Sequence, residues 1–249
     1  MAGHFIENDI FRRETVFSPA QADPLGRVLP EATALAFQDI ATEHYETLGL
    51  GRAVSDARGC FWALARSDTE YLAPVPAGTP LYLDTCTGKQ AHGLFWRHYR
   101  IMTPEGTELV RSVGTWLLMD VITRSMVLDC GWITEKGGHS LPGQLPATLR
   151  RPPVPEELPR RAERTVTDAE ADINGHLNNT LYLRWCGDLL EESFASSHRL
   201  RRLWIEYKKE LPLGARTALT FALEDGTLFV RGFHDDKEAF SARCEYDPV

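Results

Sequence analysis

Residues 172–190 read Asp-Ile-Asn-Gly-His-Leu-Asn-Asn-Thr-Leu-Tyr-Leu-Arg-Trp-Cys-Gly-Asp-Leu-Leu, and the second half of the chain is organised around them. Asp172, Asn174 and His176 occupy alternate positions, so an extended backbone would place their three side chains on one face. A polar turn in which Asp172 forms an Asx motif is the simpler alternative, although it gives no reason for the amide and the imidazole to share that face. The stretch therefore predicts a carboxylate, an amide and an imidazole gathered in one place.

Asn178 and Asn179 are good N-cap residues, and they precede a predicted helix over residues 179–193. Apolar residues recur along it at helical spacing and would form a buried stripe: Tyr182, Trp185, Cys186, Leu189 and Leu190. Cys186 lies in this stripe, so we interpret it as a core residue rather than a reactive thiol. The polar group is thus expected beside the amino end of a buried helix.

The two halves of the chain repeat one plan of strand, helix and strands. The first half has a predicted strand over 10–18 and a helix that starts at Pro30, where a missing N–H costs little. Gly49 and Gly51 are expected to end that helix. The predicted later strands are 60–71, 80–87, 93–103, 107–119 and 126–134 in the first half, and 162–168, 202–210, 217–224, 228–233 and 239–246 in the second. Hairpin turns are predicted at Pro104-Glu105-Gly106 and Asp225-Gly226.

Matching residues support a duplication. Ala22, Asp23 and Gly26 recur as Ala171, Asp172 and Gly175, each 149 positions later. Further along the chain, Glu70, Tyr71, Pro76 and Gly78 recur as Glu206, Tyr207, Pro212 and Gly214, each 136 positions later. The polar residues do not recur, because Leu25, Arg27 and Pro74 stand where the second copy has Asn174, His176 and Glu210. We therefore expect the chemistry in the second copy alone.

Residues 137–160 differ from the rest of the chain, since they are rich in proline and glycine and show no hydrophobic period. This composition predicts a linker. It divides the chain into a first domain over 1–136, expected to supply the pocket wall, and a second over 161–249, expected to carry the reactive groups.

Composition excludes several classes of function. The chain has 249 residues, 43% of them hydrophobic and 25% charged, as in ordinary globular proteins. Its net charge of −8 argues against nucleic-acid binding, and no apolar run is long enough for membrane insertion. Five scattered cysteines and an N-terminus without a secretion signal favour a cytoplasmic location. Motifs for metals, phosphates and dinucleotides do not occur, so we expect neither a metal nor a cofactor.

The chain resembles the acyl-acyl carrier protein (acyl-ACP) thioesterases of plants and bacteria. The stretch from Asp172 to Tyr182 is similar to the family signature D-x-N-x-H-(V/L)-N-N-x-x-Y, and residues 205–210 are similar to its E-Y-(R/K)-(R/K)-E segment. In the first half, residues 91–97 and 115–120 also look like the family. The resemblance implies an α+β fold, a tandem (double) hotdog in which each half has a long helix wrapped by an antiparallel sheet.

The resemblance also implies an activity, the hydrolysis of fatty acyl-ACP to release the free fatty acid. Asp172 and Glu210 would activate water or attack directly, while His176 and Asn174 would orient the water and polarise the carbonyl. A backbone N–H near Asn178 or Asn179 would complete the oxyanion site. Plant members carry a cysteine where this chain has Leu211, so a cysteine mechanism is not expected here. Glu206 is interpreted as an exposed strand residue.

The implied partner is the acyl carrier protein, which is acidic and should dock on basic residues. The basic cluster nearest the motif is Arg199, Arg201, Arg202, Lys208 and Lys209, and a second comprises Arg150, Arg151, Arg160, Arg161 and Arg164. A solvated surface is the default interpretation of both. The oligomeric state is left open, with a homodimer among the options.

Three alternatives stay open. The chain could be an acyl-CoA thioesterase of the same fold or a hotdog hydratase, although a hydratase would have other spacings and no E-Y-K-K-E segment. It could also be a non-catalytic acyl-binding sensor or scaffold, against which the retention of all four polar residues argues. Chain length, saturation preference, and water attack versus an acyl-enzyme anhydride are not decided by the sequence.

Overall fold

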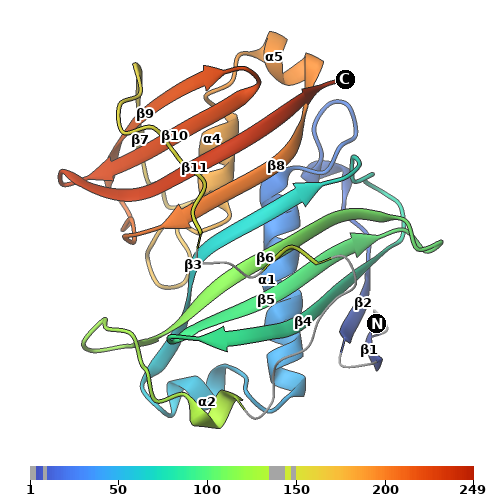
Figure 1. Cartoon of the computed structure of the whole chain (residues 1–249), viewed down its shortest axis with the longest axis vertical. Coiled ribbons are helices and arrows are strands. Elements are labelled where there is room, and N and C mark those ends of the chain that lie inside the picture. Colours follow the sequence, from blue (N-terminus) through green and yellow to red (C-terminus); the bar gives the residue numbers. More distant parts are fainter. Residues whose placement is uncertain (1–3, 8–9, 135–143, 147–149) are drawn as a thin grey trace. The chain divides into compact units, whose positions relative to one another are not determined.

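The computed structural model describes residues 4–7, 10–134, 144–146 and 150–249, with the backbone alone for residues 4–7 (Figure 1). The chain forms two compact units. The first unit comprises Met1–Ala65 and Tyr71–Thr148, and the second comprises Arg66–Glu70 and Leu149–Val249. Of the predicted linker, residues 137–143 and 147–149 lie outside the described residues.

The first unit is an antiparallel sheet with one long helix. Its strands run in the spatial order β1-β2-β4-β5-β6-β3. Their bounds are β1 His4–Glu7, β2 Ile10–Thr15, β3 Cys60–Tyr71, β4 Leu81–Ala91, β5 Leu94–Met102 and β6 Glu108–Asp120. The helices are α1 Pro30–Thr47 and two short ones, α2 Arg52–Asp56 and α3 Gly131–Thr134. A single 3-10 turn, η1, spans Pro19–Gln21.

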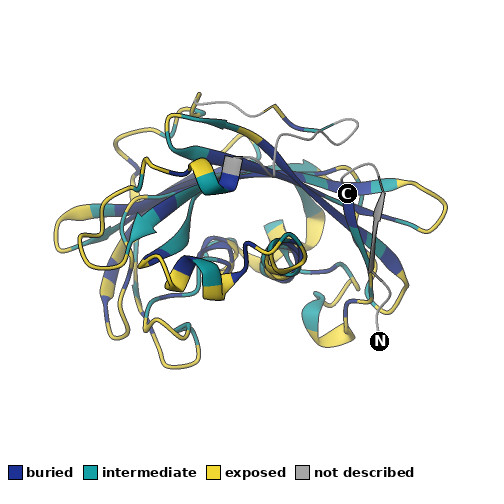
Figure 2. Ribbon diagram, turned by 90° about the horizontal axis from the view of Figure 1, so that it is seen from below, coloured by how far each residue is buried: buried dark blue, intermediate teal, exposed yellow. Residues whose placement is uncertain are grey.

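Helix α1 begins at Pro30, as predicted, and Gly49 follows its end with a φ of 69°, a conformation that a glycine adopts without strain. Its buried residues recur every three or four positions and so lie on one face of the helix: Ala32, Thr33, Ala36, Phe37, Ile40, Ala41 and His44. Figure 2 colours the chain by burial and shows most of the exposed residues in the loops. Phe37 stacks on Tyr99 of β5 with ring centroids 4.9 Å apart. Apolar burial along this face therefore holds the helix in the curve of its sheet.

The second unit repeats the plan with shorter helices. The Arg66–Glu70 segment of β3 pairs with β8, and the strand order continues as β8-β11-β10-β9-β7. The bounds are β7 Arg160–Thr165, β8 His198–Tyr207, β9 Arg216–Glu224, β10 Thr227–His234 and β11 Lys237–Pro248, with α4 Leu181–Gly187 and α5 Glu192–Ser197. Asp225 and Gly226 join β9 to β10 with φ values of 47° and 74°. This confirms the predicted hairpin, because a two-residue turn with positive φ at both positions matches the strand twist.

Two sequence-based expectations are wrong, and one strand was missed. The predicted helix over 179–193 is two short helices, since α4 ends at Gly187, a poor helix former. The predicted strand over 126–134 forms only a bridge at Met126 and then helix α3. Strand β1 was not predicted. The α+β class itself is confirmed, and no helix among the described residues is long and apolar enough to cross a membrane.

Candidate functional site

The predicted reactive stretch is a tight turn rather than a strand. The Asp172 Oδ1 atom accepts hydrogen bonds from the backbone N–H groups of Asn174 (2.8 Å) and His176 (3.2 Å). The turn closes when the Asp172 N–H donates to the His176 carbonyl (2.8 Å), and Gly175 provides the positive φ of 74° that the reversal requires. The expectation of three side chains on one extended face is therefore wrong. The Asx alternative is correct, because the Asp172 carboxylate shapes the backbone.

A second loop brings Glu210 to this turn. The Leu177 N–H donates to the Leu211 carbonyl at 2.7 Å, and the Leu213 N–H donates to the Gly175 carbonyl at 2.9 Å. These bonds lock the loop after β8 against the turn. They place Glu210 Oε2 3.6 Å from His176 Nε2, with the glutamate side chain 50% exposed and the histidine side chain 23% exposed. The Asn174 amide Nδ2 lies 3.3 Å from Asp172 Oδ2. The two loops thus bring the four predicted catalytic residues together as two side-chain pairs, Asp172 with Asn174 and His176 with Glu210.

Tyr182 of α4 lies beneath both carboxylates, and it was predicted only as a core residue. Burial raises the pKa of its phenol, and a hydrogen bond with the Leu211 backbone opposes that rise. The charges of Glu210 and Asp172 raise the pKa further, so the phenol stays protonated near neutral pH. Tyr182 therefore presents a neutral hydroxyl to the loop that carries Glu210.

The two asparagines after the turn act on the backbone. Asn178 Oδ1 accepts from both the N–H (3.0 Å) and the hydroxyl (2.9 Å) of Thr180, ahead of the first turn of α4. The Asn178 N–H donates to the Glu170 carbonyl at 2.9 Å, so this N–H is already engaged and cannot also serve an oxyanion in this arrangement. The Asn179 carbonyl accepts from the Tyr207 hydroxyl at 2.8 Å. Asn178 therefore forms an Asx turn ahead of α4, whose N-cap residue is Thr180 and not either of the predicted asparagines. An oxyanion role for Asn179 stays a prediction.

Glu170 anchors the same turn to the helix. Its Oε1 accepts from the Trp185 indole N–H at 2.9 Å, and its Oε2 accepts from the N–H and hydroxyl of Thr167. Burial raises the pKa of Glu170, but these hydrogen bonds outweigh that effect and lower it overall. Sequence analysis missed this residue. The Thr-x-x-Glu spacing, a capping-box pattern, was the signal that could have found it.

The first unit contains the same turn with different chemistry. Asp23 Oδ1 accepts from the N–H groups of Leu25 and Arg27 (both 2.9 Å), and Gly26 has a φ of 77°. Val28 N–H donates to the Val75 carbonyl as Leu177 N–H does to the Leu211 carbonyl. However, Arg27 Nε lies 2.6 Å from Asp23 Oδ2, whereas the second copy has an imidazole at that position. The repeated hydrogen bonds support duplication, and the ion pair leaves the first turn without a base.

The basic cluster predicted for carrier docking is ion-paired throughout. Arg199 and Arg201 contact Asp247 at 3.3 and 3.2 Å, and Arg201 also contacts Glu245. The remaining pairs are Arg202 with Asp68 at 2.7 Å, Lys208 with Glu238 at 2.6 Å and Lys209 with Asp235 at 3.6 Å. These residues therefore form a charge-compensated surface, and docking there stays a prediction.

Glu206 is not the exposed strand residue that was expected. It is 6% exposed, and its carboxylate lies 2.9 Å from Arg151, 3.8 Å from Arg66 and 3.9 Å from Lys208. Buried carboxylates need such partners, so three cations account for its position. Cys186 is buried in the core as predicted, and all five cysteines are buried free thiols. In the part of the chain that the structure describes, no group of three or more His, Cys, Asp or Glu side chains is arranged to hold a metal ion.

A comparison with models of known protein families finds a match in the second half of the chain. Residues 157–242 match the family model for the acyl-ACP thioesterase C-terminal domain. Over these residues the chain is similar to that domain, which confirms the predicted resemblance. The resemblance supports a thioester hydrolase.

Solved thioesterase structures share the fold of the whole chain. An acyl-ACP thioesterase from Bacteroides thetaiotaomicron is 19% identical, with a TM-score of 0.86 over 96% of this chain and 98% of that one. The 12:0-ACP thioesterase from Umbellularia californica is 18% identical, with a TM-score of 0.87 over 98% of this chain and 100% of that one. At these identities the likeness shows the fold alone, and it confirms the predicted hotdog class. A comparison with curated protein sequences finds no match.

Proposed function

We propose that this thioesterase hydrolyses fatty acyl-ACP, releasing the free fatty acid and so ending chain elongation. The observation that carries the proposal is the pairing of His176 Nε2 with Glu210 Oε2 at 3.6 Å on a half-exposed edge. A base beside an imidazole, reachable from solvent, is what the attack of water on a thioester requires. The separation exceeds a hydrogen bond, and such contacts often tighten when substrate binds.

The two carboxylates have different roles in this proposal. Asp172 already accepts from two backbone N–H groups and from the Asn174 amide, so it positions the turn. Glu210 has the more exposed carboxylate beside His176, and it acts as the general base. This division replaces the expectation that both carboxylates activate water.

In the reaction, Glu210 removes a proton from water as the water oxygen bonds to the acyl carbonyl carbon. His176 orients that water, and the Asn174 amide donates to the oxyanion that develops on the carbonyl oxygen. The carbon–sulfur bond then breaks and the thiolate leaves with both bonding electrons. A thiol pKa of about 8.5 makes this departure easy. Glu210 returns its proton to the thiolate, which completes the hydrolysis.

Isotope labelling detects an acyl-enzyme anhydride that water opens at the glutamyl carbon. A single turnover in ¹⁸O-labelled water places the label in the released fatty acid if water attacks the thioester directly. If Glu210 forms an anhydride that water opens at the glutamyl carbon, the label appears in the Glu210 carboxylate. Mass spectrometry of the peptide containing Glu210 measures this difference.

Matched substrates test both the activity and the carrier. Thiol release is measured from acyl-ACP and acyl-CoA thioesters of equal chain length across a series of lengths. The proposal expects kcat/KM for acyl-ACP to exceed that for acyl-CoA by about tenfold or more, a difference of about 1.4 kcal/mol in transition-state binding. A preference for acyl-CoA would make the protein an acyl-CoA thioesterase. Release from neither carrier would support a non-catalytic acyl-binding module.

Docking of the carrier is tested at Lys209, whose ion-pair partner Asp235 is largely exposed. If the predicted basic cluster binds the acidic carrier, Lys209→Glu raises KM for acyl-ACP and leaves KM for acyl-CoA unchanged, because only the carrier protein contacts that surface. Equal KM values for wild type and Lys209→Glu would reject docking at this cluster. The same test would then apply to the second basic cluster, where Arg161 is exposed.

A further inference from the structure

Arg97 of β5 is buried without a carboxylate, unlike its neighbours in the same sheet. It is 2% exposed, and no carboxylate among the described residues lies within ion-pair distance of it. Three residues further along the strand, Arg100 donates to Asp84 at 2.7 Å, and Arg12 donates to the same fully buried carboxylate at 2.8 Å. Side chains alternate along a strand, so Arg97 and Arg100 lie on opposite faces. Arg12 and Arg100 therefore share a carboxylate counterion on one face of the sheet. Arg97, on the opposite face, has none among the described residues.

The contacts that Arg97 does make are all with neutral groups. Its Nη1 donates to His44 Nδ1 at 3.0 Å and to Thr85 Oγ1 at 3.2 Å. An arginine only donates, so His44 must present a neutral, unprotonated Nδ1. The guanidinium carbon lies 4.3 Å from the centre of the Tyr45 ring. These groups fix the orientation of the guanidinium and leave its charge uncompensated.

Two polar atoms beside one another have no hydrogen-bond partner. They are Arg97 Nη2 and the hydroxyl of Thr87, which stands directly opposite Arg97 in the β4–β5 register. Paired residues in adjacent strands project on the same side of the sheet. A buried donor without an acceptor is costly, and buried charge without a counterion more so. Together the Arg97 N–H and the Thr87 hydroxyl can donate hydrogen bonds to an anionic oxygen of a ligand.

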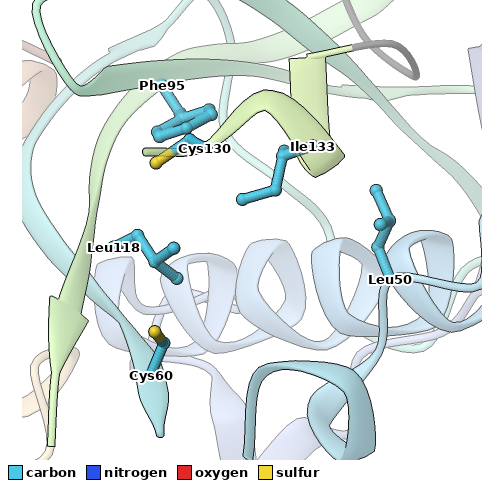
Figure 3. Packing of buried hydrophobic residues seen from close by; sticks show 6 residues of the cluster. All are labelled: Leu50, Cys60, Phe95, Leu118, Cys130 and Ile133. Carbon is cyan, nitrogen blue, oxygen red and sulfur yellow. The ribbon is translucent and has the colours of Figure 1, made fainter. Parts of the chain in front are cut away.

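Apolar side chains adjoin this polar pair. The cluster around Phe95 contains Leu50, Cys60, Phe95, Leu118, Cys130 and Ile133, whose side chains are drawn in Figure 3. Half-buried aromatic residues surround it, among them Tyr45, Trp62 and Trp116. Tyr45 links the two regions, because its ring lies against the Arg97 guanidinium and stacks on Trp62 at 5.4 Å. The Arg97 cation therefore borders a buried apolar cluster.

We propose that the first unit binds an aliphatic carboxylate, with its head on Arg97 and Thr87 and its chain on the cluster around Phe95. The carboxylate supplies the missing counterion and bonds bidentately to the guanidinium. Tyr45 is half-buried and lies against the guanidinium. The ligand is a free fatty acid. Its binding is independent of the hydrolysis proposed for the second unit.

Calorimetric titration with octanoate and octan-1-ol tests the binding site, because the two ligands share a chain and differ in charge. We expect octanoate to bind wild type about tenfold or more tightly than octan-1-ol. Arg97→Met is expected to abolish that difference. Arg111→Met, which removes the same charge from β6 on the opposite face of the sheet, is expected to preserve it. Equal affinity for the two ligands in wild type, or an unchanged preference in Arg97→Met, would overturn the proposal.

A second variant guards against a failure of Arg97→Met to fold. Thr87→Val preserves the shape of the side chain and removes only its hydroxyl, so it is expected to weaken octanoate binding and leave octan-1-ol binding unchanged. A folded Thr87→Val protein with wild-type affinity for both ligands would contradict the predicted head-group site.

Hydrolysis is measured separately from binding. Because the ligand is a free fatty acid, hydrolysis of the octanoate thioester should not depend on Arg97, whereas octanoate binding should. A protein that does not hydrolyse the thioester would refute the proposed function, and the calorimetric result would still decide the binding site.

Discussion

Arg27 Nε lies 2.6 Å from Asp23 Oδ2, in a turn of the first unit that repeats, bond for bond, the turn holding Asp172 and His176. Arg27 neutralises the charge of the Asp23 carboxylate. In the second copy, the corresponding Asp172 carboxylate accepts from the uncharged amide of Asn174. At the matching loop, Pro74 replaces Glu210. The two turns thus share a backbone conformation and differ in their charges. Substitutions in the first turn can therefore serve as controls for substitutions in the second.

Glu210→Gln should lower kcat by about 10²-fold or more while the protein stays folded, because the amide cannot accept the proton from water. The side chain is half exposed, so its replacement should hardly affect stability. Thiol release from acyl-ACP measures the effect, with the exposed Glu224→Gln as the matched control. A kcat within threefold of wild type would reject Glu210 as the base.

Asp172→Ala should lower both stability and activity, because two backbone N–H groups lose their acceptor. The expected cost is about 1–2 kcal/mol of unfolding free energy. Asp172→Asn preserves one acceptor oxygen and should retain most of that stability and a substantial part of kcat. Urea denaturation and steady-state rates are the measurements. An Asn variant that is fully stable yet as inactive as Ala would instead make Asp172 a reacting group.

Asp23→Ala provides the matched experiment in the first unit. Its carboxylate accepts the same two backbone bonds, so the variant should lose a similar amount of stability, about 1–2 kcal/mol. Its kcat should remain within about threefold of wild type, since this turn lacks the imidazole and the second carboxylate. A large loss of kcat in a folded Asp23→Ala protein would show that the first turn takes part in the reaction.

His98 should make the folded state sensitive to acid. Burial lowers the pKa of this histidine to about 4, whereas the unfolded chain has the ordinary value near 6.5. Between these values the unfolded chain binds a proton that the folded protein does not. Stability is therefore complete above pH 6.5 and decreases as the pH falls towards 4, by at most about 1.4 kcal/mol per unit.

His98→Phe retains a ring at this position and removes the titration, so it tests that prediction. The difference in unfolding free energy between wild type and variant should change between pH 6.5 and pH 4 and be constant above pH 7. Denaturation curves at several pH values measure it. A difference that does not vary with pH would show that His98 titrates alike in both states.

Thiol reagents should not inhibit hydrolysis by the native protein. All five cysteines are buried, and hydrogen bonding with Cys244 together with burial raises the pKa of the Cys186 thiol well above its usual value. Burial therefore shields all five thiols from the reagent, and the raised pKa of Cys186 keeps that thiol in its unreactive protonated form. Incubation with N-ethylmaleimide followed by rate measurement tests this expectation, with denatured protein as the positive control for labelling. Rapid inactivation in step with labelling of one cysteine would contradict it.

Local sequence signals predicted the elements that depend on local chemistry. Pro30 and Gly49 set the ends of α1, and Asp225-Gly226 set a hairpin, because each residue fixes its own backbone angles. The proximity of His176 and Glu210 was predicted from the family signature, because their separation along the chain does not show that their two loops meet.

The incorrect predictions concern residues whose conformation or burial depends on partners that the sequence pattern does not show. Alternate spacing of Asp172, Asn174 and His176 suggested a strand, but the side-chain acceptor of Asp172 competes successfully for the backbone N–H groups. Glu206 looked like a solvated charge because Arg66 and Arg151, which make its burial tolerable, are remote in sequence. Leu189 and Leu190 extended the apolar pattern beyond Gly187, where the helix ends.

The pairing of Arg66–Glu70 with β8 bears on how this protein can be dissected. A fragment starting within the proline-rich connection would lack that segment, so the backbone groups of β8 would face water as a bare edge, and Glu206 would lose Arg66. Such edges recruit other chains, and we expect the isolated fragment to aggregate. The second unit thus includes a strand segment from much earlier in the chain, and we expect that no single continuous fragment reproduces it.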